Sequence, residues 1–248
     1  MKATREIMGM PITIEAVGDN VTQAVIEEVF NRFQEIDDRF STYKPGSEIS
    51  RLNFGTLDSH DASEEVRAVL DECARLARLT RGYFKIRRDG MIDPSGYVKG
   101  WAIYQAARLL DRRFITRYCI DAGGDMQIRG EAPAGGPWKI GITHPFESGK
   151  LAKLIYVKNA AVATSGTYLR GGHILNPITG LNVTDPVSLT VIGAQIDQVD
   201  ALANAAICMG EDGLAFVQQQ RCEAVMITQS GKVLQTLGFR RYEHKSAR

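Results

Sequence analysis

One ten-residue stretch, Asp93-Pro-Ser-Gly-Tyr-Val-Lys-Gly-Trp-Ala102, combines residue types that could hold an anion, a metal ion or both. Asp93 offers a carboxylate, and Lys99 offers an ammonium group six positions later. Proline fixes one backbone dihedral and glycine permits conformations that other residues resist, so we expect a shaped loop that leads into a helix from about Gly100. The N-terminus of that helix would carry partial positive charge. Taken alone, the stretch is equally consistent with an ordinary junction between a loop and a helix.

A second candidate is a pair of oxygen ligands on a helix expected from Asp197 to Met209. Asp200 and Asn204 are four residues apart, and this spacing puts both side chains on one helical face. Carboxylate and amide oxygens are hard ligands that suit Mg²⁺, which typically takes one or two protein carboxylates together with phosphate oxygens and water. A simpler interpretation also fits, in which the helix dipole favours the aspartate and Asn204 is merely polar.

Three further segments could contribute to such a site. Residues Thr164 to Tyr168 offer hydroxyl groups and a glycine after an apolar strand, which predicts either a phosphate cradle or a strand-ending turn. The Gly123-Gly124 pair is typical of a tight turn. His173 follows two glycines, and an ordinary pKa of about 6.5 makes histidine the usual candidate for a general base, although a lone histidine is more often structural.

The periodicity of the apolar residues predicts the elements that must position these groups. Helices are expected at Val21 to Phe40, from the Ser63 cap to Thr80, at Gly100 to Leu110, at Asp197 to Met209 and at Leu214 to Gln219. Strands are expected at Ile12 to Val17, Tyr118 to Asp121, Met126 to Arg129, Trp138 to Thr143, Leu151 to Val157, Ala161 to Thr164, Leu189 to Ala194, Ala224 to Thr228 and near Val233.

This order of elements indicates the fold class. Helices lie mainly before Leu110 and most strands follow it, a segregation typical of an α+β fold with helices packed on largely antiparallel sheet. No linker rich in Pro, Gly or Ser divides the chain, so residues 1–248 are predicted to form a single domain.

Composition excludes several classes of protein. Lys and Arg number 30 against 29 Asp and Glu, so the basic surface that nucleic-acid binding requires is not expected. No apolar run is long enough for a transmembrane helix. The first residues lack the apolar core of a signal peptide, so we expect a cytoplasmic protein or a mature form already trimmed. The four cysteines are scattered, which predicts buried thiols and neither a zinc site nor disulfides.

Read together and in order, nine segments resemble the ApbE-like family of FAD:protein FMN transferases. Any one of them is weak evidence, but together they span nearly the whole chain. They are Met8 to Pro11, Phe40 to Tyr43 through Ser50 to Asn53, Gly82 to Phe84, Asp93 to Ala102, Ala122 to Asp125, Trp138 to Pro145, Val162 to Tyr168, His173 to Gly180 and Val199 to Asn204.

The resemblance implies an ApbE-like, T-fold-like α+β domain that uses Mg²⁺ and takes FAD as a substrate. Its implied activity is transfer of FMN from FAD onto a Ser or Thr hydroxyl of an acceptor flavoprotein, with release of AMP. By position, it implies flavin-nucleotide contacts for Met8, Tyr43, Phe84, Asp93, Lys99 and Leu175. It implies metal ligation by the carbonyl of Gly96 and by the side chains of Asp200 and Asn204. It also implies catalytic roles for His173, as the base, and for Asp200.

Three positions depart from the family pattern. Asn204 stands where the family usually has threonine or serine, Lys85 stands where Phe84 would be followed by aspartate, and Tyr104 replaces a common acidic residue. Lys85 and Asn204 leave open the alternative that the protein binds FAD without transferring FMN. A third possibility keeps the same site but uses water as the nucleophile and hydrolyses FAD to FMN and AMP.

Overall fold

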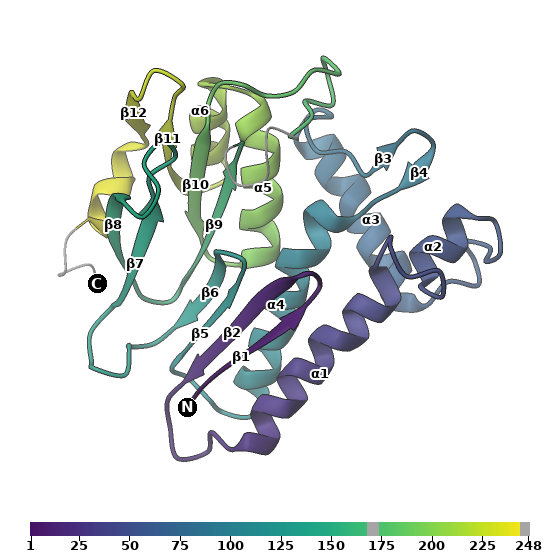
Figure 1. The fold of residues 1–248 in the computed structure, drawn as a ribbon, viewed down its shortest axis with the longest axis horizontal. Coiled ribbons are helices and arrows are strands. Elements are labelled where there is room, and N and C mark those ends of the chain that lie inside the picture. Colours follow the sequence, from purple (N-terminus) through teal and green to yellow (C-terminus); the bar gives the residue numbers. More distant parts are fainter. Residues whose placement is uncertain (168–173, 244–248) are drawn as a thin grey trace.

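The computed structural model describes residues 1–167 and 174–243, in which helices pack against an antiparallel sheet (Figure 1). Eight strands form this sheet in the order β1-β2-β5-β6-β9-β10-β11-β12, and every neighbouring pair runs antiparallel. Their bounds are β1 Lys2–Ile7, β2 Met10–Ala16, β5 Tyr118–Ala122, β6 Asp125–Arg129, β9 Ala160–Gly166, β10 Ser188–Gly193, β11 Glu223–Ile227 and β12 Val233–Gln235. The predicted α+β class with largely antiparallel sheet is confirmed.

The remaining elements are two small hairpins and seven helical segments within the described residues. The hairpins join β3 (Arg87–Arg88) to β4 (Met91–Ile92), and β7 (Trp138–Thr143) to β8 (Leu151–Val157). The helices are α1 Gln23–Phe40, α2 Glu48–Asn53, α3 Glu64–Leu79, α4 Ser95–Arg112, α5 Ile196–Cys208, α6 Asp212–Gln219 and the 3₁₀ segment η1 Leu237–Tyr242. Strand β1 and the β3–β4 hairpin were not predicted.

Both faces of the sheet are covered at the inner strand β9, where successive residues point to opposite faces. In β9, Ala161 and Ala163 belong to the larger apolar cluster, which includes the helices. Ala160 and Val162 belong to a smaller cluster with residues of β7, β8 and η1. The near-continuous apolar run of β9 is therefore explained by cover on both sides.

Helix α4 begins five residues earlier than the sequence indicated. We expected it from about Gly100, but it starts at Ser95, and Asp93 accepts a hydrogen bond from the Ser95 N–H at 3.0 Å. Pro94 suits this junction because the first turn of a helix needs no backbone donor there. As a result Gly96 and Lys99 lie on the first turns of a helix rather than in a loop.

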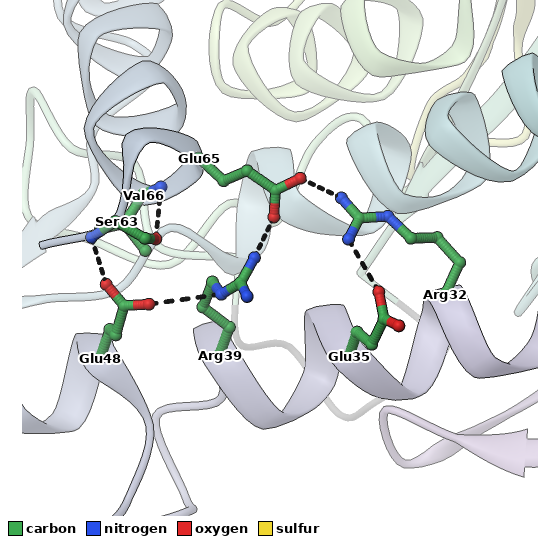
Figure 2. Close-up of polar contacts among 7 residues, drawn as sticks. All are labelled: Arg32, Glu35, Arg39, Glu48, Ser63, Glu65 and Val66. Atoms are coloured by element: carbon green, nitrogen blue, oxygen red, sulfur yellow. Dashed lines mark hydrogen bonds and ion pairs between the residues drawn. The ribbon is translucent and has the colours of Figure 1, made fainter.

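A chain of charged contacts holds helices α1, α2 and α3 together (Figure 2). Arg32 and Arg39 of α1 both pair with Glu65 of α3, and Arg39 also pairs with Glu48 of α2 at 3.3 Å. Glu48 accepts a hydrogen bond from the backbone N–H of Ser63 at 2.6 Å. Ser63 in turn caps α3, as the sequence predicted. The network therefore fixes the C-terminal half of α1, whose last residue leads into the cavity described below.

The helices and the cysteines can be compared with what the composition indicated. Within residues 1–167 and 174–243, no helix combines the length and apolar character needed to cross a bilayer. All four cysteines are buried free thiols, as predicted. Burial raises the pKa of Cys208 to about 11, so this thiol is unreactive near neutral pH.

Candidate functional site

A cavity of about 490 Å³ lies where several element ends meet. This volume is typical of small-molecule sites, which span roughly 300–1,000 Å³. Its wall combines the turn after β1, the end of α1, the start of α4, the β5–β6 turn, the end of β9 and one residue of α5. The lining residues include Met8, Met10, Phe40, Ser41, Tyr43, Asp93, Gly96, Lys99, Gly123, Thr164, Ser165, Ile174 and Asn204.

The turn between β1 and β2 presents Met8 to this cavity in an unusual conformation. Ile7 pairs with Met10, so Met8 and Gly9 form a two-residue hairpin loop with φ of 58° and 71°. Two positive φ values are typical of a type I′ turn, whose first position favours Asn, Asp or Gly. A methionine there is strained, and such strain persists where the surrounding structure holds the residue for a purpose.

The two predicted metal ligands of α5 meet the start of α4. The Asn204 side-chain Nδ2 donates to the Gly96 carbonyl at 3.0 Å and to Asp200 Oδ1 at 3.1 Å. The other oxygen of Asp200 accepts a hydrogen bond from the Gly100 N–H at 3.0 Å. Residues about 100 positions apart in the chain therefore converge, and the i,i+4 spacing of Asp200 and Asn204 does bring both side chains to one point.

This close approach of α4 and α5 depends on a glycine. A Cβ atom at Gly100 would lie 2.7 Å from the Ile196 carbonyl oxygen and 2.9 Å from the Asp200 Cβ. Both distances are below any normal contact, so a side chain at this position would push the two helices apart.

Lys99 carries the positive charge of the site between two buried carboxylates. Its ammonium group pairs with Asp125 and lies 3.5 Å from Asp200 Oδ1. Both aspartate side chains are 2% exposed, whereas that of Lys99 is 27% exposed and lines the cavity. Asp125 is held by a second contact, since its Oδ1 accepts a hydrogen bond from the Thr164 N–H at 2.9 Å.

Burial and the neighbouring charges shift the pKa values of Asp200 and Lys99. Burial raises the pKa of Asp200 above its usual value, and Lys99 opposes this shift. Burial would lower the pKa of Lys99, but the carboxylates of Asp200 and Asp125 outweigh it and raise that pKa, so Lys99 stays protonated. The triad of two aspartates and one lysine has a net charge of −1 when both carboxylates are ionised.

The structure brings together most, but not all, of the residues that the resemblance implied. Met8, Tyr43, Asp93, Gly96, Lys99 and Asn204 line the cavity. Asp200 lies directly behind Lys99 and Asn204. Phe84 is buried beside Gly96 and does not line the cavity, and neither does Leu175, although its neighbour Ile174 does. His173 lies outside the described residues.

The contacts of two residues in this cluster were not predicted from the sequence. Ser165, which was considered for a phosphate cradle, lies in strand β9 and donates its hydroxyl hydrogen bond to Asn204 Oδ1 at 2.8 Å. Asp125, which was placed at the end of a tight turn, pairs with Lys99. A signal existed for Asp125, because it begins an apolar strand and a buried carboxylate needs a charged partner.

Two departures from the family pattern lie away from the cavity wall. Lys85 is exposed, and the cavity is lined by other residues. Tyr104 lines a separate hollow with Arg108 and Gln195. Of the three departures, only Asn204 touches the candidate site.

The donor set fits a hard cation, provided that Asn204 contributes its oxygen. The Gly96 carbonyl, the Asp200 carboxylate and an amide oxygen are of the type that Mg²⁺ prefers. The described residues contain no group of three or more His, Cys, Asp and Glu side chains with metal-ligand geometry. A bound ion would therefore depend on the carbonyl and the amide beside Asp200. The adjacent ammonium group of Lys99 and the N-terminus of α4 favour an anion in the same cavity.

Comparison with known proteins gives consistent results. The sequence model of the ApbE family matches residues 8–91 and 85–226 of this chain. An FAD:protein FMN transferase of Vibrio cholerae is 26% identical in an alignment that covers 88% of this chain and 82% of the relative. The solved flavin transferase ApbE from Vibrio cholerae superposes with a TM-score of 0.85 at 24% identity, and the alignment covers 98% of each chain. An ApbE protein from Thermotoga maritima gives 0.88 at 21% identity, covering 98% of this chain and 99% of that one. At these identities the structural likenesses establish the fold.

Proposed function

Because the chain belongs to the ApbE family, we propose that it is an FAD:protein FMN transferase that uses Mg²⁺. It transfers FMN from FAD onto a Ser or Thr hydroxyl of an acceptor flavoprotein and releases AMP. The observation that carries the proposal is the meeting of Gly96, Asp200 and Asn204 at a cavity that also exposes Lys99. The relative from Vibrio cholerae is an FAD:protein FMN transferase and aligns over most of both chains, which supports the same reaction.

The charges of the site suit a pyrophosphate. With both carboxylates ionised, the charges of Asp125, Asp200 and Lys99 sum to −1, and one divalent ion would change this sum to +1. An FAD pyrophosphate carries two negative charges, so the site would attract it only after the ion has bound. Lys99 faces the cavity and would hold a phosphate oxygen, while the apolar side chains of Met8, Met10 and Phe40 would contact the flavin ring.

The reaction replaces the phosphoanhydride bond of FAD with a phosphate ester bond to the acceptor. The acceptor hydroxyl forms a bond to the phosphorus of the FMN half, the bond from that phosphorus to the bridging oxygen breaks, and AMP leaves with that oxygen. When bound, Mg²⁺ would neutralise charge on the phosphoryl and leaving-group oxygens. Gly96, Asp200 and Asn204 would hold the ion, and Asp93, at the cavity wall beside the start of α4, would contact the nucleotide.

His173 is proposed as the base that removes the proton from the acceptor hydroxyl. Gly166 and Ile174 lie on either side of its segment in the chain, and both line the cavity, which supports this role. His173→Ala should slow transfer and leave FAD binding intact. A wild-type rate in this variant would rule out the assignment.

The proposal is tested with a proven acceptor flavoprotein, FAD and MgCl₂, followed by mass spectrometry of the acceptor and measurement of AMP. We expect the acceptor to gain the mass of one FMN residue and AMP to appear in equal amount. Asp200→Asn keeps the shape of the side chain and removes its charge, so transfer should fall by at least about 100-fold.

Other outcomes would select the alternatives. Release of AMP and free FMN without an acceptor would identify a hydrolase. Purified protein that binds FAD and yields neither product would identify an FAD-binding protein. Transfer at an unchanged rate in Asp200→Asn would remove Asp200 from the site.

A further inference from the structure

The carboxamide of Asn204 lies against the oxygens that would ligate an ion. Its Nδ2 is 3.0 Å from the Gly96 carbonyl oxygen and 3.1 Å from Asp200 Oδ1, and it donates a hydrogen bond to each. Its Oδ1 faces away and accepts a hydrogen bond from the Ser165 hydroxyl at 2.8 Å. Asp200 has almost no exposed surface, so Asn204 and Lys99 together close it off from the cavity.

The two ends of a carboxamide have nearly the same shape and opposite hydrogen-bonding character. A turn of about 180° around the last side-chain bond exchanges Oδ1 and Nδ2 and moves other atoms very little. Without a cation the turned state is unfavourable, because Oδ1 would then face the two oxygens of Gly96 and Asp200. The orientation in the structure is thus the one expected when no ion is bound.

With a cation the preference reverses. Neighbouring ligands of an octahedral Mg²⁺ ion at 2.0–2.1 Å lie about 2.9 Å apart. The distances from the Asn204 amide to Gly96 and Asp200, 3.0 and 3.1 Å, are close to this spacing. After the turn, Asn204 Oδ1 would lie at ligand spacing from both the Gly96 carbonyl oxygen and Asp200 Oδ1. Ser165 suits both states because a hydroxyl group can donate to Oδ1 or accept from Nδ2.

We infer that Asn204 is a turning ligand: its amide nitrogen closes the site in the absence of Mg²⁺, and its amide oxygen binds the ion when Mg²⁺ enters. Ser165 holds the amide in both states by reversing its own hydrogen bond. The inference rests on the magnesium of the proposed function and is independent of flavin transfer. It predicts that the wild-type protein binds Mg²⁺ more weakly than a variant whose side chain at position 204 donates no hydrogen bonds. In the wild type, the hydrogen bonds from Asn204 to Gly96 and Asp200 must break before the ion can bind.

The test follows the side-chain NH₂ signals of Asn204 by NMR of ¹⁵N-labelled protein during titration with MgCl₂, with and without FAD. The Asn204 pair is assigned by its loss in Asn204→Asp. We expect these signals to shift as the ion binds, because the amide leaves Gly96 and Asp200. Asn53 is the internal control, since it exchanges two hydrogen bonds with the backbone of Ile92 and should not turn.

Affinity for MgCl₂, measured by calorimetry on the same proteins, gives an independent readout. Asn204→Asp has no N–H to donate and adds a charged oxygen, so it should bind Mg²⁺ at least roughly ten-fold more tightly than the wild type. Asn204→Leu, of similar size, should bind much more weakly.

Two results would overturn the inference. One is Mg²⁺ binding that leaves the Asn204 signals unmoved, and the other is the absence of Mg²⁺ binding with or without FAD. Asn204 signals that move on Mg²⁺ binding, in a protein that fails to modify a proven acceptor, would support the inference and refute the proposed function alone.

Discussion

At the scale of single residues, the site depends on buried charges that satisfy one another. Lys99 is shared by Asp125 and Asp200, and each aspartate also accepts one backbone N–H, from Thr164 and Gly100 respectively. Removing Lys99 would leave two buried carboxylates without a charged partner, which costs far more than the ion pairs contribute. Removing either aspartate would leave Lys99 paired with the other one.

Met8 gives a prediction about substrate binding. Glycine adopts the positive φ of this turn without strain, so Met8→Gly should keep the β1–β2 hairpin while it removes the side chain from the cavity wall. We expect FAD to bind at least about five-fold more weakly, since burial of a large apolar side chain is worth roughly 1.5–3 kcal/mol. Fluorescence titration of FAD measures the affinity. Unchanged affinity in a folded variant would exclude Met8 from the flavin contacts.

The residues of the site could be predicted only in part. The spacing of Asp200 and Asn204 correctly predicted that they share a helical face. Their meeting with Gly96 required the resemblance, because nothing local in the sequence specifies which elements pack together. Ser165 acts only as a partner of Asn204, and such a role depends on a contact across 39 positions of the chain.

At the scale of elements, the junction of α4 and α5 fixes the distance between the ligands. Gly100 allows this approach and also donates its N–H to Asp200. The start of α4 differed most from the sequence expectation among the boundaries near the site, and β9 also runs two residues further than expected, to Gly166. Because glycine and proline are typical of loops, Pro94 and Gly96 made the sequence look non-helical here. The hydrogen bond from the Ser95 N–H to Asp93, which supports the first turn of α4, is seen only in the structure.

A pair of glycine substitutions tests this junction. Gly100→Ala should destabilise the fold by about 1–3 kcal/mol, because its Cβ would meet backbone that cannot yield. It should also reduce Mg²⁺ affinity by moving Asp200 away from Gly96. Gly96→Ala is the matched control, since its Cβ would lie 3.5 Å from Phe84 and 3.8 Å from Asn204, which are ordinary contacts. Urea denaturation and MgCl₂ calorimetry measure both effects, and equal behaviour of the two variants would contradict the argument.

The charged network of α1, α2 and α3 positions the opposite wall of the cavity (Figure 2). Arg39 is one residue before Phe40, which lines the cavity, and it contacts Glu48 and Glu65 of two other helices. The sequence predicted helices α1 and α3 but not the short helix α2. It could not show which of the many acidic residues would pair with Arg39.

At the scale of the whole molecule, the fold class was predictable and the order of the strands was not. The apolar character of the inner strands identified most of them, because those strands contribute side chains to the two buried clusters. Strand β1 was missed since five of its six residues are partly or fully exposed, which leaves little apolar pattern to detect. Strand order depends on long-range pairing, such as that of β6 with β9, about which local sequence carries no information.

The pH dependence of global stability provides a further prediction. Burial, with a contribution from Glu72, raises the pKa of Asp197 above its ordinary 3.8. The folded state therefore binds this proton more tightly than the unfolded state, and the carboxyl group costs stability as pH rises from about 3.8 through the raised value. Asp197→Asn cannot ionise. Its stability relative to the wild type should therefore increase from pH 4 to pH 7.

Chemical denaturation across this pH range measures the difference. The exposed Asp58, changed to Asn, serves as the control substitution. A difference between wild type and Asp197→Asn that stays constant with pH would contradict the assignment of a buried carboxyl group with a raised pKa.

The junction of α4 with α5 also determines when the protein can first become active during its synthesis. Gly100 and Asp200 are 100 residues apart, and Gly96 and Asn204 are 108 apart. A ribosome must therefore release all of α5 before the two ends can meet, and closing so long a segment is slow. Until α5 (Ile196–Cys208) has left the ribosome, Lys99 therefore has no Asp200 to contact, and the wall of the cavity lacks Asn204.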